Sequence, residues 1–252
     1  MHPARIAELL QPFLSAPCHS GSAKAGEESG VLSATQLQSI STYIDMLLHW
    51  NARINLTAIR DEEEIVTRHF GESLFAARHL FPKVYPVSSS VSPVPSVVKD
   101  FDLDSAGARS PKAEARVADL GSGAGFPGVP IKIWAPNIAL TLIESNQKKA
   151  TFLRELARTI TLTDVNIQNA RAEALPPSTY NVVTLRAVER LPKALPVAAM
   201  LLAPNGRLAL LISSSQLDST CSTLPDLIWD VPILIPNSRS RILLVGHTEP
   251  KI

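Results

Sequence analysis

The sequence has little cysteine and no long hydrophobic run at its start. Its only cysteines, Cys18 and Cys221, lie far apart in unlike contexts, which excludes a disulfide framework and a cysteine-rich metal site. Arg5 and Glu8 interrupt the short apolar stretch at the start, so it predicts neither an export signal nor a membrane span. We therefore expect a soluble cytoplasmic protein without a membrane or metal partner.

The sequence also lacks an excess of charge of either sign. Its 24 lysine and arginine residues face 23 aspartate and glutamate residues, which gives a formal net charge of +1. A strong global field would mark a nucleic-acid-binding protein, and this chain does not have one. Any contact with a polyanion must therefore come from local basic patches.

The first third of the chain predicts helices. At 252 residues the chain is near the size at which one core stops growing, so we expect one main domain with an appendage. From Val31 apolar residues recur at helical spacing behind a capping box of Ser33 and Gln36. A second helix is predicted to begin near Asp61, in a run of acidic residues that favours a helix N-terminus. Residues 1–85 are thus predicted to form a helical extension.

A segment rich in proline and serine follows the predicted helices. Residues 86–96 read PVSSSVSPVPS, in which proline blocks regular pairing and serine favours solvent. We interpret 86–113 as a flexible insertion between the extension and the rest of the chain.

From residue 114 to 252 strand, turn and helix patterns alternate, which is typical of a parallel sheet with right-handed crossovers. The predicted strands are Arg116–Leu120, Leu140–Glu144, Val165–Asn169, Asn181–Leu185 and Arg207–Ile212, and the predicted helices include Asn146–Ile160 and Lys193–Leu202. Two further strands, around Asp230–Ile235 and Arg241–Gly246, are expected to form a meander at one edge. The fold class is therefore α/β, a doubly wound Rossmann-like sheet with an N-terminal helical extension.

The strongest local signal is the glycine-rich segment 119–128, DLGSGAGFPG, between a strand and a helix. Gly121 and Gly123 let the backbone turn sharply and approach a ligand at the carboxyl ends of the strands, although an ordinary tight turn is the alternative. Phe126 stands where a dinucleotide fingerprint needs its third glycine, which disfavours NAD. The acidic Asp119 favours S-adenosylmethionine instead, because its carboxylate can help to hold the ammonium group of the methionine.

Three more residues follow neighbouring strands and suit a nucleoside. Glu144 closes the second predicted strand, where a carboxylate can accept hydrogen bonds from two ribose hydroxyls, or else cap the next helix. After the third strand, the main chain of Ala172 and the side chain of Glu173 are placed to contact an adenine edge, with a plain helix start as the alternative.

Several blocks, in this order, resemble the bacterial small-subunit ribosomal RNA guanine-N7 methyltransferases, also called glucose-inhibited division protein B. The blocks are WNARINLTAI at 50–59, RHFGESL at 68–74, the turn at 119–130, IESNQKK at 143–149, RAE at 171–173 and LRA at 185–187. Gly71 departs from the family, which usually has a larger residue there. Carried over by position, the residues lining the cofactor site would be Gly121, Phe126, Ala172, Glu173 and Arg186.

The resemblance implies a class I methyltransferase that uses S-adenosylmethionine and makes 7-methylguanine in 16S ribosomal RNA, alone or in the small ribosomal subunit. Guanine N7 carries a free lone pair, so no general base is needed and we nominate no catalytic acid or base. Alignment of the reacting atoms alone can contribute about 7 to 11 kcal/mol.

Candidate acceptor-binding residues lie on both sides of the predicted turn. A bare cation would repel a sulfonium, so Arg186 is expected to hold the cofactor carboxylate or an RNA phosphate, with a surface ion pair as the alternative. Asn51, Arg53 and Asn55 offer donors for a base edge or a phosphate. The remaining candidates are His69, as a stacking platform or a buried histidine, and a set of basic residues that form either a patch or plain solvated surface: Arg60, Arg68, Arg190 and Lys193.

Two other functions stay open at this point. One is a nicotinamide-dependent oxidoreductase, which Phe126 disfavours. The other is a non-catalytic RNA-binding or ribosome-assembly factor with the same fold, which would bind RNA without methyl transfer.

Overall fold

The computed structural model of this protein describes residues 1–15, 31–82, 113–186 and 191–249. Arg190, Cys18 and the insertion predicted at 86–113, apart from its last residue, lie outside the described residues.

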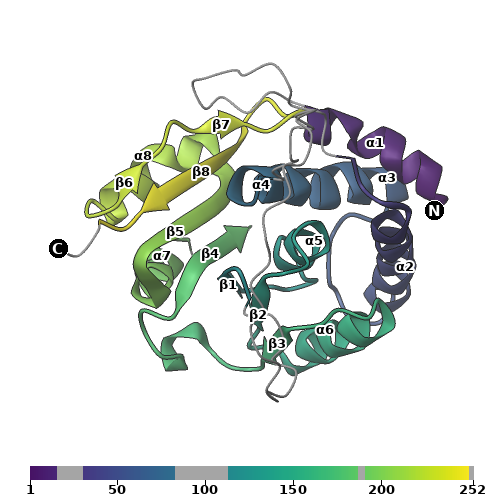
Figure 1. The fold of residues 1–252 in the computed structure, drawn as a ribbon, viewed down its shortest axis with the longest axis horizontal. Helices are drawn as coiled ribbons and strands as arrows, with labels where there is room; N and C mark the ends of the chain where they lie inside the picture. Colours follow the sequence, from purple (N-terminus) through teal and green to yellow (C-terminus); the bar gives the residue numbers. More distant parts are fainter. Residues whose placement is uncertain (16–30, 83–112, 187–190, 250–252) are drawn as a thin grey trace, which may run out of the picture.

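A mixed sheet forms the centre of the molecule (Figure 1). Its strands are β1 (Arg116–Leu120), β2 (Ala139–Ile143), β3 (Val165–Gln168), β4 (Tyr180–Arg186), β5 (Leu202–Ser213), β6 (Ile228–Trp229), β7 (Ile233–Leu234) and β8 (Arg241–His247). The order is β3-β2-β1-β4-β5-β8-β6, with β7 also paired to β8. Strands β1 to β5 run parallel, whereas β8 is antiparallel to β5, β6 and β7. The doubly wound sheet is thus confirmed. The expected meander is wrong, because the last strand, β8, lies between β5 and β6 instead of at the edge.

The strand predicted around Asp230–Ile235 is present only as the short β7, and a separate strand, β6, precedes it. Both strands have two residues, and Pro232 lies between them. Proline has no backbone N–H for a ladder, so a continuous strand cannot pass through this position with full pairing.

Helices cover both faces of the sheet. Helices α5 (Gly128–Trp134) and α6 (Gln147–Thr159) lie on one face, and α7 (Leu191–Leu201) and α8 (Leu217–Thr223) on the other (Figure 1). Successive strand residues point to opposite faces, so Val117 joins the hydrophobic cluster under α5 and Ala118 joins the one under α7. From β1 the chain adds strands first toward β3 and then, from β4, toward β5 on the other side. This topological switch point between β1 and β4 is the position where doubly wound sheets bind ligands.

The N-terminal helices pack onto the α5 side and share its hydrophobic cluster. They are α1 (Pro3–Ser15), α2 (Ala34–Asn51) and a run formed by α3 (Glu62–Glu64), the π-helical η1 (Ile65–Gly71) and α4 (Glu72–Leu80). The predicted capping box is confirmed, because Ser33 Oγ accepts from the Gln36 amide while the Gln36 side chain accepts from the Ser33 amide. Asp61 caps α3 through a 2.8 Å bond from the Glu64 amide.

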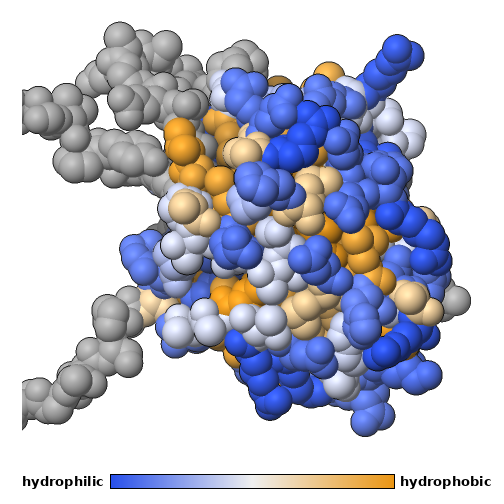
Figure 2. Space-filling model, turned by 90° about the vertical axis from the view of Figure 1, so that its right-hand side faces the viewer, coloured by the Kyte–Doolittle hydropathy of each residue, from blue (hydrophilic) through white to orange (hydrophobic). Residues whose placement is uncertain are grey.

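The outer surface of these helices is mainly polar. The side that carries α1, α2 and α6 in Figure 1 is largely hydrophilic, and its apolar residues form separate patches (Figure 2). Among the helices that the structure describes, none has the length and apolar character needed to cross a membrane.

Candidate functional site

The glycine turn between β1 and α5 has a backbone that depends on glycine. Gly121, Gly123 and Gly125 have φ values of 69°, 58° and 97°, which side-chain-bearing residues rarely adopt. A Cβ atom at Gly125 would lie 2.6 Å from Tyr43 Oη and 2.9 Å from Val129 Cγ2. The turn therefore keeps its main chain against neighbouring elements and leaves its outer side open to a ligand.

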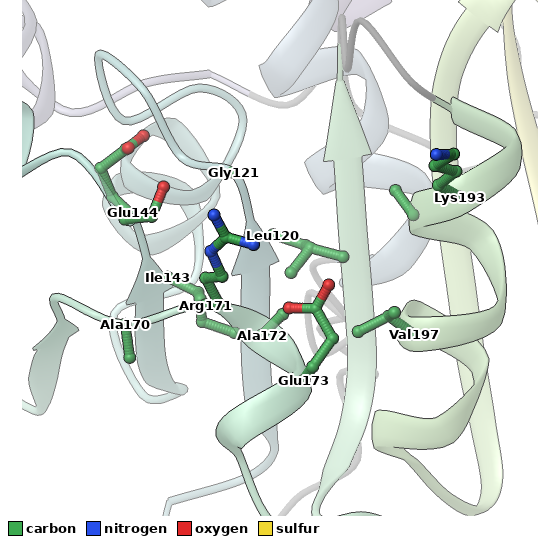
Figure 3. A pocket seen from close by; sticks show the side chains of 12 residues that line it. Leu120, Gly121, Ile143, Glu144, Ala170, Arg171, Ala172, Glu173, Lys193 and Val197 are labelled. Atoms are coloured by element: carbon green, nitrogen blue, oxygen red, sulfur yellow. The ribbon is translucent and has the colours of Figure 1, made fainter.

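A cavity of about 520 Å³ lies beside this turn, at the carboxyl ends of β1, β2 and β3. Its volume is in the range of small-molecule sites. Figure 3 shows Glu144 on one side of it and Lys193, from α7, on the other. The lining residues are Leu120, Gly121, Ile143, Glu144, Ser145, Ala170, Arg171, Ala172, Glu173, Lys193, Ala194 and Val197.

Glu144 is held in place while keeping capacity to accept more hydrogen bonds. Its Oε2 accepts from the Gly123 amide at 2.9 Å, and its Oε1 accepts from the Asn146 amide at 2.7 Å. Asn169 Nδ2 fixes the backbone by donating to the carbonyl of Glu144 at 2.9 Å. Each carboxylate oxygen has a second lone pair, so Glu144 can still accept from two hydroxyls on the cavity side. Sequence reasoning missed Asn169, although its place at the end of β3 was a signal.

Asp119 lies beneath the turn rather than on the cavity wall. It is fully buried, and its oxygens accept from Thr184 Oγ1 at 2.9 Å and from the Gly128 amide at 3.2 Å. Burial raises the pKa of the Asp119 carboxyl to about 6. In this arrangement Asp119 supports the turn, and a contact with a cofactor ammonium group stays a prediction.

Phe126 joins the glycine turn to the N-terminal helices and does not line the cavity. Its ring stacks on Tyr43 of α2, with centroids 5.1 Å apart, and on His69 of η1, with centroids 4.7 Å apart. The Tyr43 hydroxyl also donates to the carbonyl of Ala124 in the turn. These stacked rings fix the position of the turn relative to the helical part.

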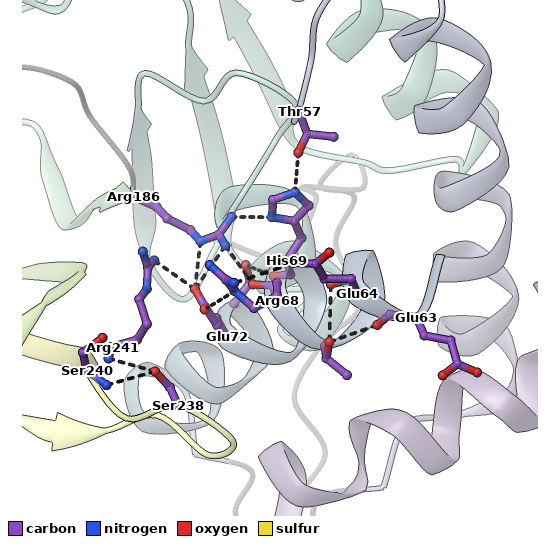
Figure 4. Close-up of polar contacts among 12 residues, drawn as sticks. Thr57, Glu63, Glu64, Arg68, His69, Glu72, Arg186, Ser238, Ser240 and Arg241 are labelled. Carbon is purple, nitrogen blue, oxygen red and sulfur yellow. Dashed lines mark hydrogen bonds and ion pairs between the residues drawn. The ribbon is translucent and has the colours of Figure 1, made fainter. Parts of the chain in front are cut away.

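Arg186, at the end of β4, is satisfied inside the protein. Its Nε and Nη2 donate to Glu72 Oε2 at 3.2 and 3.1 Å, and Nη2 also donates to the carbonyl of Arg68 at 2.7 Å (Figure 4). The side chains of Arg186 and Glu72 are 8% and 2% exposed. The ion pair is thus buried and not on the surface, and the predicted bond from Arg186 to an external carboxylate or phosphate stays a prediction. Sequence reasoning did not nominate Glu72.

His69 is neutral and has a defined proton position. Arg186 Nη1 lies 2.8 Å from His69 Nδ1, and a guanidinium can only donate, so Nδ1 accepts. Burial, with the nearby arginines, lowers the pKa of His69 to about 3. The ring proton is therefore on Nε2, which donates to Thr57 Oγ1 at 2.7 Å. This matches the buried-histidine alternative, although the ring does stack on Phe126.

The segment after α2 forms a turn closed by Asn51. The Asn51 Oδ1 atom accepts from the amides of Leu56 and Thr57 at 2.8 and 3.0 Å, and Nδ2 donates to the Thr57 carbonyl at 2.9 Å. The Asn51 side chain is buried, which argues for a structural role. Arg53 and Asn55 are exposed on the same turn. Because Thr57 binds His69, this turn is linked to Arg186 and the sheet.

No group of three His, Cys, Asp or Glu side chains that could hold a metal ion occurs in the part of the chain that the structure describes.

Comparisons with known proteins point to one family. The model of a family described as "GidB: rRNA small subunit methyltransferase G" matches residues 36–84 and 90–223. This match covers more than half of the chain, including the glycine turn, the cavity and the turn after α2.

Individual relatives have matching names. A protein of Xanthomonas euvesicatoria pv. vesicatoria named ribosomal RNA small subunit methyltransferase G is 34% identical over 194 residues, which is 77% of this chain and 76% of that protein. A protein of the same name from Halorhodospira halophila is 35% identical over 195 residues, 77% of this chain and 78% of its own.

A solved structure shares the fold. The ribosomal protein L11 methylase of Lactobacillus delbrueckii subsp. bulgaricus aligns with a TM-score of 0.52 and 13% identity, over 72% of this chain and 79% of that one. At this level of identity the likeness shows the fold alone.

Proposed function

This chain belongs to the rRNA small subunit methyltransferase G (GidB) family, and we propose that it transfers a methyl group from S-adenosylmethionine to N7 of a guanine in 16S ribosomal RNA. The observation that carries the proposal is the cavity at the ends of β1 and β2, where Glu144 faces the glycine turn within the matched region.

The residues of the cavity fit S-adenosylmethionine. Glu144 has a free lone pair on each oxygen for the ribose hydroxyls, and the backbone of Gly121 borders the cavity without a side chain. Ala172 and Glu173, in the short helix η2 (Ala172–Ala174), offer main-chain and carboxylate groups to an adenine edge. When bound, the cofactor supplies a methyl group made electrophilic by a positively charged sulfur.

The chain needs to position the reactants but not to move a proton before attack. Guanine N7 attacks with a lone pair that is free at neutral pH, so the protein contributes by aligning the acceptor with the cofactor. The buried pairing with Glu72 suits this role, because it offsets part of the charge of Arg186, a cation that would otherwise repel a sulfonium.

Exposed groups on the turn after α2 and on the cavity wall support an RNA partner. Arg53 and Asn55 stand on the turn that is tied to His69, and Arg171 and Lys193 line the cavity itself. Cations of this kind bind phosphates and orient a nucleic acid without reading its sequence. The proposed partner is 16S ribosomal RNA, alone or within the small ribosomal subunit, in the cytoplasm.

The test is transfer of a radiolabelled methyl group from S-adenosylmethionine to small ribosomal subunits from cells that lack this methylation. We expect label in the RNA. RNA binding without transfer would favour an assembly factor, and binding of NAD in place of S-adenosylmethionine would favour an oxidoreductase.

A further inference from the structure

Three arginines surround the buried Glu72 at the edge of the site. Glu72 Oε2 is 3.1 Å from Arg186 Nη2 and 3.0 Å from Arg241 Nη2. The other oxygen, Oε1, is 3.4 Å from Arg68 Nε. Figure 4 shows the guanidinium groups converging on this one carboxylate from η1, β4 and β8. Arg241 was not among the residues that the sequence pattern indicated.

This cluster holds more positive than negative charge. Arg68 has a second partner, because its Nη1 lies 3.7 Å from the half-exposed Glu64. Arg186 and Arg241 are left to share a single carboxylate oxygen, and the neighbouring His69 is neutral. Burial lowers the pKa of Arg186, and the charge of Arg241 lowers it further. An enclosed cation without a full counter-charge is costly, so the cluster is suited to an additional anion.

A small cavity opens beside the two arginines that share Glu72. Its volume is about 40 Å³, and Arg186, Arg241 and Gln216 supply its polar groups; we call it the arginine pocket. Arg241 Nε is buried and has no hydrogen-bond partner in the part of the chain that the structure describes. Gln216 Oε1 accepts from the Ser213 amide at 3.0 Å, which leaves the side-chain amide hydrogens to donate elsewhere. Unused N–H donors and positive charge together make the chemistry of an oxyanion site.

The position of the arginine pocket distinguishes it from the cofactor cavity. It lies at the ends of β4 and β5 and the start of β8, whereas the large cavity lies at the ends of β1, β2 and β3. The two share no lining residue among those described. A ligand here would therefore be on the other side of β4 from the cofactor cavity. The small volume suits one anionic group rather than a nucleoside.

We propose that the arginine pocket binds a phosphate group of the RNA backbone next to the methylated guanine. This inference rests on the proposed function and adds a contact that positions the acceptor. The phosphate oxygens would accept from Arg241 Nε and from Gln216, and their charge would balance Arg186 and Arg241.

The test measures binding of unmethylated 16S ribosomal RNA as a function of salt for Arg241→Gln and the wild type. Loss of one phosphate contact should make the slope of log affinity against log salt shallower by about 0.7 to 0.9. Arg239→Gln is the matched control, because Arg239 is exposed on the turn before β8 and no ion pair of it occurs among the described residues. It should change the slope less than Arg241→Gln does.

Arg241→Lys covers the case in which Arg241→Gln does not fold. It keeps the charge beside Glu72 but has no Nε donor, so we expect the wild-type salt slope with weaker RNA binding. The inference would be overturned by equal salt slopes for Arg241→Gln and Arg239→Gln, or by equal RNA affinities for Arg241→Lys and the wild type. Methyl transfer by the wild type would still support the proposed function in either case. A weaker affinity of Arg241→Gln for S-adenosylmethionine would overturn it too, by assigning the pocket to the cofactor carboxylate.

Discussion

Arg186 Nη1 donates to His69 Nδ1 across 2.8 Å, and this bond joins the end of β4 to the π-helical segment η1. Since the imidazole must accept at Nδ1, it donates at Nε2 to Thr57. One neutral ring thus connects the sheet, the helical part and the turn after α2. π-Helical segments are rare and often occur at functional sites, in keeping with the place of η1 here.

The first prediction concerns the pH dependence of stability. The pKa of His69 is about 3 in the folded protein and 6.5 for an ordinary histidine. Between these values the unfolded chain binds the proton and the folded chain does not, so the stability due to His69 is complete above pH 6.5 and is lost as the pH falls toward 3. The pKa of Asp119 is raised from 3.8 to about 6, which has the opposite effect between those values.

The variant His69→Asn separates the effect of His69 on stability from that of Asp119. Asp119 is present in both proteins, so its effect cancels in the difference between their free energies of unfolding. Urea unfolding should show that the substitution costs less free energy of unfolding at about pH 4.5 than at about pH 7.5. His49→Asn, at an exposed position on α2, controls for the loss of an imidazole. An equal cost of His69→Asn at both pH values would contradict the neutral buried ring.

The second prediction concerns the contact between Gly71 and Phe13. A Cβ atom at position 71 would lie 2.6 Å from Phe13 Cε2, and Phe13 is only 2% exposed. Gly71→Ala should therefore destabilise the protein by about 1 to 3 kcal/mol through overpacking. In the background Phe13→Leu the smaller side chain should relieve the clash, so Gly71→Ala should cost less there. Equal costs in the two backgrounds would show that α1 does not pack on η1 as described.

The third prediction concerns the cofactor. Glu144→Ala should weaken binding of S-adenosylmethionine by about 1 to 3 kcal/mol, because the ribose hydroxyls lose their acceptor. Isothermal calorimetry measures this change directly. Glu114→Ala removes an equal charge just before β1, at the opposite end of the sheet, and should leave the affinity unchanged. Unchanged affinity in Glu144→Ala would remove Glu144 from the cofactor site.

Much of the sheet was predictable because its signals are local. The strand Arg116–Leu120 has the bounds that the sequence indicates, and the helix predicted at Asn146–Ile160 is α6, for which Asn146 is the N-cap. The placement of Glu144 beside the glycine turn follows from the sheet itself, since adjacent parallel strands end at the same edge. Local pattern and topology together were therefore enough to locate the cavity.

The rest depends on contacts between residues far apart in the chain. Nothing near Phe126 indicates that Tyr43 and His69 will stack on its ring, and nothing near Arg186 indicates that Arg241 will share Glu72 with it. Helix α1 was missed as well, since Pro12 and the mixed charges of the segment obscure its periodicity. These features arise from tertiary packing, which overrides local propensity.

The central claim is tested most directly by analysing the nucleosides of 16S ribosomal RNA after reaction. Unmethylated small subunits are incubated with the protein and S-adenosylmethionine, and the digested RNA is examined by liquid chromatography and mass spectrometry. Gly121→Arg serves as the inactive control, because a bulky cation would fill space that the glycine turn leaves beside the cavity. The account predicts 7-methylguanosine with the wild type and none with Gly121→Arg. A different methylated nucleoside, or no methylation by a protein that binds S-adenosylmethionine, would contradict it.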